Sequence, residues 1–175
     1  MQTIIEALAH TPWWVYLVLY LLVRRGIAAR RPNVVPLWRL AILPVLFAAL
    51  DIQGILGNPA ITPGLLFAAL VALLAGAAFG YGLTRRVRVR ADHARWLIGL
   101  EANRTVLPLI LVIFALKYAV AYITAADPAL AARPAFLLFT LVVGGFCTGI
   151  FVGRFATYVV KFRLAPNEPL AAPTG

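Results

Sequence analysis

The sequence predicts an all-α protein built as a single polytopic bundle of five membrane-spanning helices. Of its 175 residues, 63% are hydrophobic and 13% are charged, whereas a soluble domain carries about 45–50% apolar and about 25% charged residues. The apolar residues also form long blocks, most of them close to the roughly 20 residues that cross a bilayer as a helix. We expect spans at about residues 12–30, 37–56, 63–83, 105–124 and 134–154. Residues 1–164 would then form one transmembrane domain, followed by a disordered tail at residues 165–175.

The first span, residues 12–30, is the least regular of the five. Its uninterrupted apolar run covers only residues 13–23 and ends at Arg24 and Arg25. Either the helix continues while these arginines snorkel to the headgroups, or they face a cavity inside the protein. No Lys or Arg precedes Arg24, so the positive region of a secretory signal peptide is missing. We therefore expect a retained helix.

The distribution of basic residues predicts the orientation of the bundle. Residues 24–39, 85–104 and 154–163, which cover the first connection, the third connection and the segment after the fifth span together with the adjoining span ends, hold 14 Lys and Arg residues. The second and fourth connections hold only Arg133. Basic residues in short connections collect on the cytoplasmic side. The amino terminus is therefore expected outside and the carboxyl terminus in the cytoplasm.

Glycines four residues apart mark one face of the third span and one face of the fifth. The residues concerned are Gly76 and Gly80, and Gly145, Gly149 and Gly153. Glycines on one face allow two helix backbones to approach closely. We expect this face to pack helices together, either within the monomer or across a homodimer.

The second and fourth spans resemble each other weakly. Residues 39–51 and residues 104–117 each begin with Arg, carry Leu-Pro a few residues later and end in a charge deep in the span. This pattern suggests a parallel duplication of a helical hairpin, an arrangement found in transporters.

Two opposite charges, Asp51 and Lys117, lie inside apolar spans. They follow the arginines that open their spans by 12 and 13 residues, which places both at about 18–20 Å along their helices. Intramembrane charges commonly pair with one another, so we expect these two to be in contact. Gln53 and Tyr118 could add hydrogen-bonding groups to an intramembrane polar site. The pair could be a purely structural link or an ion-coupling site in a polar cavity.

The third connection, "TRRVRVRADHARWLIGLEANR", is strongly basic. Its arginines follow a span directly, and such clusters attract anionic headgroups on the cytoplasmic side. We expect four of them to contact anionic lipid: Arg85, Arg86, Arg88 and Arg90. The excess of basic residues on the cytoplasmic side that orients a membrane protein would by itself also account for these arginines. Nucleic acid is not an expected partner, because a cluster beside lipid is already occupied.

The chain resembles a bacterial family of small integral membrane proteins known as a domain of unknown function. The resemblance rests on "HTPWW" (residues 10–14), "FALKYAV" (residues 114–120) and the glycine-rich last span, in an order that covers nearly the whole chain. It implies a multi-pass protein of the bacterial inner membrane and supplies no activity.

Three functions are compatible with the sequence. The first is a transporter-like or channel-like protein for a small solute or ion, with its site around Asp51 and Lys117. The second is a membrane-embedded enzyme or redox accessory acting on a lipid or quinone, and the third is a non-catalytic lipid-binding scaffold or subunit. The single Cys147 and the two histidines outside the apolar runs make no Cys/His metal cluster. Neither a metal, nor a cofactor, nor catalytic residues are expected.

Overall fold

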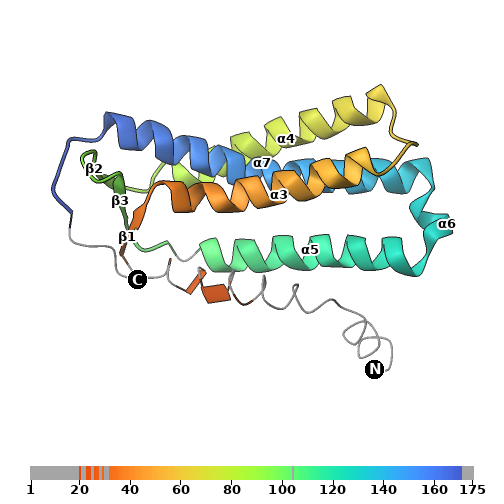
Figure 1. The fold of residues 1–175 in the computed structure, drawn as a ribbon, viewed down its shortest axis with the longest axis horizontal. Helices are drawn as coiled ribbons and strands as arrows, with labels where there is room; N and C mark the ends of the chain where they lie inside the picture. Colours follow the sequence, from red (N-terminus) through yellow and green to blue (C-terminus); the bar gives the residue numbers. More distant parts are fainter. Residues whose placement is uncertain are drawn as a thin grey trace.

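The computed structural model describes residues 20, 23, 24, 26, 27, 29, 32–103 and 105–170. This part of the chain is mostly helical (Figure 1). Its long helices are α3 (Trp38–Leu56), α4 (Pro63–Thr84), α5 (Val106–Ala126) and α7 (Pro134–Leu164), and a short α6 (Pro128–Ala131) connects α5 to α7. The four long helices are each long and apolar enough to cross a membrane. The predicted first span lies mostly outside the described residues, so the count of five stays a prediction.

Helix starts follow the proline signals in the sequence. Pro63, Pro128 and Pro134 each occupy the first turn of a helix, where the missing N–H group costs nothing. The Thr62 hydroxyl accepts a hydrogen bond from the Leu65 amide at 3.4 Å and caps α4. The four long helices begin within one residue of the predicted spans, whereas α7 continues for ten residues beyond the predicted end at residue 154.

A three-stranded antiparallel sheet lies at one end of the bundle, and α6 lies at the other (Figure 1). The strands are β1 (Asn33–Pro36), β2 (Val89–Asp92) and β3 (Leu97–Leu100), in the order β1-β3-β2. The expectation of an all-α protein therefore needs correction, because the first and third connections pair with each other. We call the two ends of the bundle the sheet end and the α6 end.

The sheet covers the last turns of α7. This helix has 31 residues and is therefore about 46 Å long, well beyond the roughly 30 Å of hydrocarbon in a bilayer. Ala91 and Ile98 of the sheet are fully buried and pack with Tyr158 and Phe162 of the extra turns. These residues form a small second core outside the expected membrane region.

The segment at residues 165–170 packs along β2, which corrects the prediction of a disordered tail for these residues. The Glu168 amide donates to the Ala91 carbonyl at 2.9 Å, and the Asn167 side chain accepts from the His93 amide at 3.0 Å. The free edge of β2 thus gives the segment hydrogen-bond partners that the sequence alone does not reveal. Residues 171–175 lie outside the described part of the chain.

Helices α4 and α7 make the closest contact between helices. They run in the same direction and cross each other (Figure 1). All the predicted packing glycines lie in this contact, which we call the glycine seam: Gly76 and Gly80 of α4, and Gly145, Gly149 and Gly153 of α7. A Cβ atom built on Gly145 would lie 2.5 Å from the Ala69 carbonyl oxygen. The prediction of a packing face is confirmed, and its partner is a helix of the same chain.

The two hairpins suggested by the sequence repeat differ in their packing. Gly82 follows Pro63 by 19 residues, as Gly153 follows Pro134, so a repeat would make these two glycines equivalent. A Cβ on Gly82 would meet no atom of the described residues within 4 Å, whereas Gly153 lies directly against the backbone of Ala77. This shared spacing therefore does not mark equivalent contacts.

Candidate functional site

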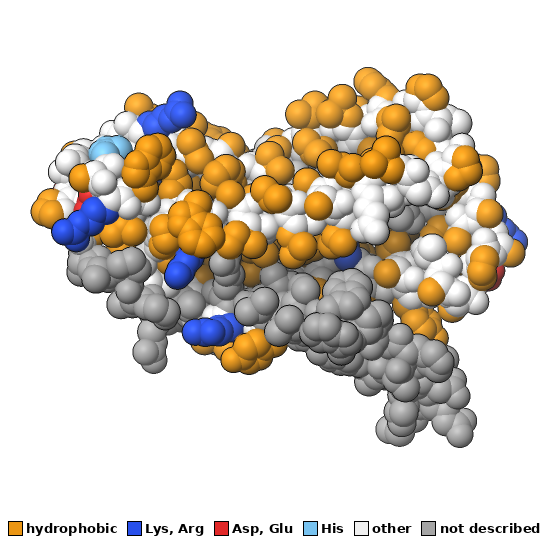
Figure 2. Space-filling view, viewed as in Figure 1, with side chains coloured by type: hydrophobic (Ala, Val, Ile, Leu, Met, Phe, Trp, Pro, Cys, Tyr) orange, Lys and Arg blue, Asp and Glu red, His pale blue; other side chains and the backbone are white. Residues whose placement is uncertain are grey.

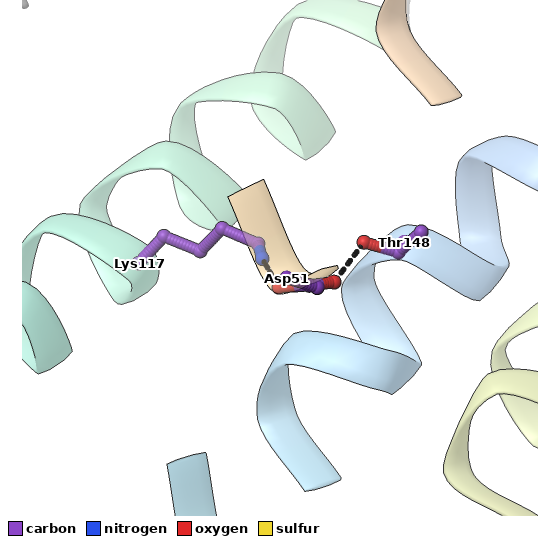
Figure 3. Close-up of polar contacts among 3 residues, drawn as sticks. All are labelled: Asp51, Lys117 and Thr148. Carbon is purple, nitrogen blue, oxygen red and sulfur yellow. Dashed lines mark hydrogen bonds and ion pairs between the residues drawn. The ribbon is translucent and has the colours of Figure 1, made fainter. Parts of the chain in front are cut away.

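Asp51 joins three helices through its carboxylate. Lys117 Nζ of α5 donates to Oδ1 at 2.5 Å, and Thr148 Oγ1 of α7 donates to Oδ2 at 2.5 Å. Figure 3 shows the two side chains reaching the carboxylate from opposite sides. The predicted contact between Asp51 and Lys117 is confirmed, and Thr148 is an additional member that the sequence analysis missed. We call these three residues the polar triad.

The polar triad is only partly shielded from its surroundings. The side chain of Lys117 is 18% exposed and that of Asp51 is 25% exposed. The Lys117 ammonium group also lies 5.3 Å from the centre of the Phe47 ring, within the range of a cation–π interaction. Gly144 of α7 makes room for the carboxylate, since a Cβ there would lie 2.9 Å from Asp51 Oδ1.

An apolar cluster fills the space between helices on the sheet side of the polar triad. Its buried members come from α3, α5 and α7: Phe47, Ile110, Ile113, Cys147, Ile150 and Phe151. The rings of Phe47 and Phe151 stack with their centroids 5.1 Å apart. This cluster separates the polar triad from the sheet end of the bundle.

A cavity of about 750 Å³ lies on the α6 side of the polar triad. Helices α3, α4, α6 and α7 supply most of its lining. Among the described lining residues, five have polar side chains and the others are apolar or glycine. The five polar residues are Asp51, Asn58, Thr124, Thr140 and Thr148. The cavity therefore extends from the α6 end to Asp51 and Thr148 of the polar triad, and its walls are mostly hydrocarbon.

Thr140 is a further polar residue of this cavity that the sequence analysis did not single out. Its Oγ1 atom is buried and has no hydrogen-bond partner. Thr140, Gly144 and Thr148 follow each other at intervals of four along α7, which places them on one face of the helix. The signal in the sequence was present, because a Thr-x-x-x-Gly-x-x-x-Thr spacing interrupts an apolar span.

The other two residues predicted for the polar site do not line the cavity. Gln53 is exposed on α3, two residues beyond Asp51 and hence on another face of the helix. Tyr118 stacks on Phe114, with their ring centroids 6.3 Å apart. Neither residue belongs to the cavity lining.

The four predicted lipid-contacting arginines lie at the sheet end. Arg85, Arg86, Arg88 and Arg90 are all exposed, and Figure 2 shows Lys and Arg side chains at that end of a largely apolar surface. Arg90 Nε lies 4.0 Å from a carboxylate oxygen of Glu168, and both side chains are at least half exposed. An exposed ion pair of this length contributes little. The contact of the four arginines with anionic lipid stays a prediction.

Lys161 ties the end of α7 to the end of α4. Its Nζ donates to three carbonyl oxygens, those of Thr84 at 3.0 Å, Arg85 at 2.8 Å and Val87 at 2.6 Å. The last carbonyls of a helix have no partner within the helix, and a cation there is favourable. Lys161 therefore closes the sheet end of the glycine seam.

Asp92 at the end of β2 is held by backbone amides. Burial would by itself raise the pKa of its carboxyl. The Arg95 and Leu170 amides donate to the carboxylate at 3.1 and 3.3 Å, and the charge of Arg95 adds to their effect. The pKa of Asp92 consequently lies below its ordinary value.

Arg154 of α7 is a buried cation, with 6% of its surface exposed. Its Nη2 donates to the Tyr158 hydroxyl at 3.4 Å, while its Nη1 has no hydrogen-bond partner. No salt bridge to Arg154 occurs within the described part of the chain. Arg154 thus differs from Lys117, which is partly exposed and is paired with a carboxylate.

Among the described residues, no three His, Cys, Asp or Glu side chains are grouped so that they could hold a metal ion. What the site can do chemically follows from the cavity and the polar triad, which together offer an apolar enclosure ending in a hydrogen-bonded ion pair. Comparison of the chain with protein-family models, with curated proteins and with solved structures finds no match.

Proposed function

We propose that the protein is transporter-like and binds a small solute in the cavity, with the polar triad at the inner end of the binding site. The observation that carries this proposal is the cavity itself, which extends from the α6 end to Asp51 and Thr148. Ligand cavities of membrane proteins commonly lie where discontinuous or polar elements interrupt the apolar interior. A cavity that stops at an ion pair fits a binding site open to one side.

Movement of a solute beyond the polar triad requires a change in the contact between α3 and α5. The salt bridge between Asp51 and Lys117 connects these helices, and the apolar cluster fills the space on its sheet side. A ligand that also hydrogen-bonds to Asp51 would share the carboxylate charge with Lys117, which weakens the salt bridge and favours an arrangement with α5 displaced. Binding energy would thereby shift the balance between two conformations, which is the requirement for alternating access.

Access to the cavity from water tests this function directly. Leu137 lines the cavity, and Ile113 belongs to the apolar cluster outside it. With the native Cys147 replaced by Ala, Leu137→Cys should react with a small methanethiosulfonate reagent in lipid nanodiscs, whereas Ile113→Cys should not. Equal reactivity of the two variants, or an unreactive Leu137→Cys, contradicts the proposal.

The orientation and location belong to the same proposal. The excess of Lys and Arg at the sheet end supports a cytoplasmic sheet end and an external α6 end in the bacterial inner membrane. In intact cells, Asn58→Cys should react with an impermeant maleimide and Ala94→Cys should not. Ala94 is the suitable reporter because it is exposed, whereas Ala91 is completely buried. Labelling of Ala94→Cys alone would reverse the orientation.

A lipid-binding role is the second candidate, because most of the cavity lining is apolar. A lipid held permanently in the cavity would protect Leu137→Cys in the native membrane, and extraction of lipid by detergent would make it reactive. A transporter cavity should react in both settings. The same variant therefore separates the two functions.

A further inference from the structure

We infer that the cavity takes an uncharged amphiphile, a slender apolar molecule with one hydrogen-bond-donating head group such as an alcohol or an amide. This inference rests on the proposed function, because it names the class of ligand for the same cavity. It is carried by the charge balance of the lining, by the unused hydrogen-bonding capacity of two lining residues, and by the apolar walls.

The charge balance disfavours an ion as the ligand. Among the described residues of the lining, Asp51 is the only one with a charged side chain, and Lys117 at 2.5 Å neutralises it from outside the cavity. A charged ligand would lose hydration without gaining a counter-charge, which is costly between mostly apolar walls. A neutral ligand avoids this cost and does not have to break the salt bridge in order to enter.

The polar groups at the inner end favour a donor on the ligand. An ionised carboxylate offers about four lone-pair positions, and Lys117 and Thr148 use two of those on Asp51. The Asp51 side chain remains 25% exposed and lines the cavity. A hydroxyl or amide hydrogen of a ligand could therefore be accepted without displacing either protein donor.

Thr140 supplies a second group for the same head. Its Oγ1 has no partner, and an unsatisfied buried hydroxyl normally calls for an explanation. A threonine in a helix populates two rotamers, so rotation about Cα–Cβ can turn the hydroxyl toward the cavity that the residue lines. A ligand head group can therefore donate to Asp51 and can also accept a hydrogen bond from Thr140.

The rest of the cavity wall is apolar and indicates the size and character of the apolar part of the ligand. Leucine, isoleucine, alanine and glycine dominate the lining between Asp51 and α6, and burial of hydrocarbon against them is favourable by about 25 cal/mol per Å². The volume of about 750 Å³ lies within the roughly 300–1,000 Å³ of small-molecule sites. An apolar body of moderate length is thus accommodated between the head group and the α6 end.

Protection of a cavity cysteine provides the test. Leu137→Cys in the Cys147→Ala background is reacted with the methanethiosulfonate reagent in nanodiscs, in the presence of decan-1-ol, decane, decanoate or decyltrimethylammonium. Decan-1-ol should slow the reaction saturably and at a lower concentration than the other three compounds. Adding Thr140→Val should raise the decan-1-ol concentration required about 3- to 10-fold, as expected for the loss of one hydrogen bond.

Thr157→Val is the matched control for Thr140→Val. Thr157 is on the same helix, and its Oγ1 donates to the Gly153 carbonyl outside the cavity. This variant should leave protection by decan-1-ol unchanged, and similar thermal stability of the two variants would show that both fold.

The outcomes separate the inference from the proposed function. Better protection by decanoate or decyltrimethylammonium overturns the uncharged class, and equal protection by decane overturns the donor head group, while a reactive Leu137→Cys still supports the cavity as a binding site. An unreactive Leu137→Cys overturns the proposed function and the inference together.

Discussion

The contact between α4 and α7 and the contact between α3 and α5 hold the bundle together in opposite ways. In the glycine seam, backbone lies against backbone, and Lys161 adds hydrogen bonds at its end. Between α3 and α5, the contact combines the salt bridge of Asp51 and Lys117 with side chains of the apolar cluster, and the part of α3 nearest the α6 end lines a cavity. The first contact depends on close backbone packing, whereas the second depends on side chains and includes an ion pair.

Because of this difference, the two contacts are expected to differ in how easily they rearrange. Small residues in close contact leave few alternative packings, because any displacement opens voids or creates overlaps. A salt bridge with partial exposure can be broken and formed again when a ligand hydrogen-bonds to the same carboxylate. The glycine seam is therefore suited to a fixed frame and the α3–α5 contact to a movable part.

The largest expected effect is a change of shape in the glycine seam. In Gly149→Leu, the new side chain would overlap the backbone of Leu73 and Ala77, and overpacking of this kind costs about 3 kcal/mol or more. We expect loss of the monodisperse protein in size-exclusion chromatography. Gly82→Leu is the control, since nothing lies within 4 Å of a Cβ there, and it should purify like the wild type. Two equally stable variants would show that the seam tolerates separation of its helices.

The next effect concerns charge in the α3–α5 contact. Lys117→Met and Asp51→Leu each leave one buried charge without its partner, which costs on the order of 3–5 kcal/mol. Partial exposure of both side chains places the expected loss near the lower value, about 3 kcal/mol. The double variant should recover much of this loss in thermal unfolding, because it leaves no unpaired charge. A double variant as unstable as the sum of the single variants would contradict the role of the salt bridge.

These two contacts also show what the sequence could predict. The seam glycines repeat every four residues on one helix each, so their common face follows from helix geometry alone. The depth of Asp51 and Lys117 follows from counting residues along two helices, and their opposite charges supply the reason to meet. Both predictions needed only local spacing and one physical rule.

The cavity, the sheet and Thr148 needed information that no local pattern contains. Thr148 reaches Asp51 because α7 crosses beside α3, which depends on how the seam orients α7. Each strand has four residues, and β1 is separated from β3 by two helices, so their pairing is a tertiary outcome. The continuation of α7 to Leu164 could have been noticed, because no helix-breaking residue follows residue 154 until Pro166.

Lys161 tests how much charge adds to a contact fixed by shape. Lys161→Met removes the donor to the Thr84, Arg85 and Val87 carbonyls. Water at the end of the bundle can replace part of these hydrogen bonds, so we expect a loss of about 1–2 kcal/mol. Arg163→Met is the control, because Arg163 is exposed on the same turn. An equal loss of stability in both variants on thermal unfolding would attribute the loss to the change in overall charge and not to the hydrogen bonds between Lys161 and the end of α4.

Arg154 tests what a buried cation does without a carboxylate. In Arg154→Met the apolar stem is largely kept, and the buried guanidinium with its unpartnered Nη1 is removed. Apolar replacement of buried charged groups is often neutral or stabilising, so we expect the free energy of unfolding to be unchanged or higher by about 1 kcal/mol. A loss comparable to that of Lys117→Met in the same assay would show that Arg154 has a partner when the protein is in a membrane.

The smallest expected effect distinguishes the carboxylate of the sheet from that of the polar triad. Asp92 is stabilised by the amides of Arg95 and Leu170 and not by an ion pair in the membrane. Because its pKa in the folded protein lies below the ordinary value of 3.8, the stabilisation it gives is complete above about pH 4. It is lost as the pH falls through the lowered pKa. The amide proton resonances of Arg95 and Leu170 should therefore stay constant from pH 7 to about 4 and shift only below that.

The variant Asp92→Asn tests the same carboxylate. Its amide resonances should show no shift in acid, and the tail at residues 165–170 should be held less firmly at neutral pH, because a neutral amide is a weaker acceptor than a carboxylate. A titration midpoint above 3.8 would mean that the effect of burial on the pKa of Asp92 outweighs that of the hydrogen bonds from the two amides.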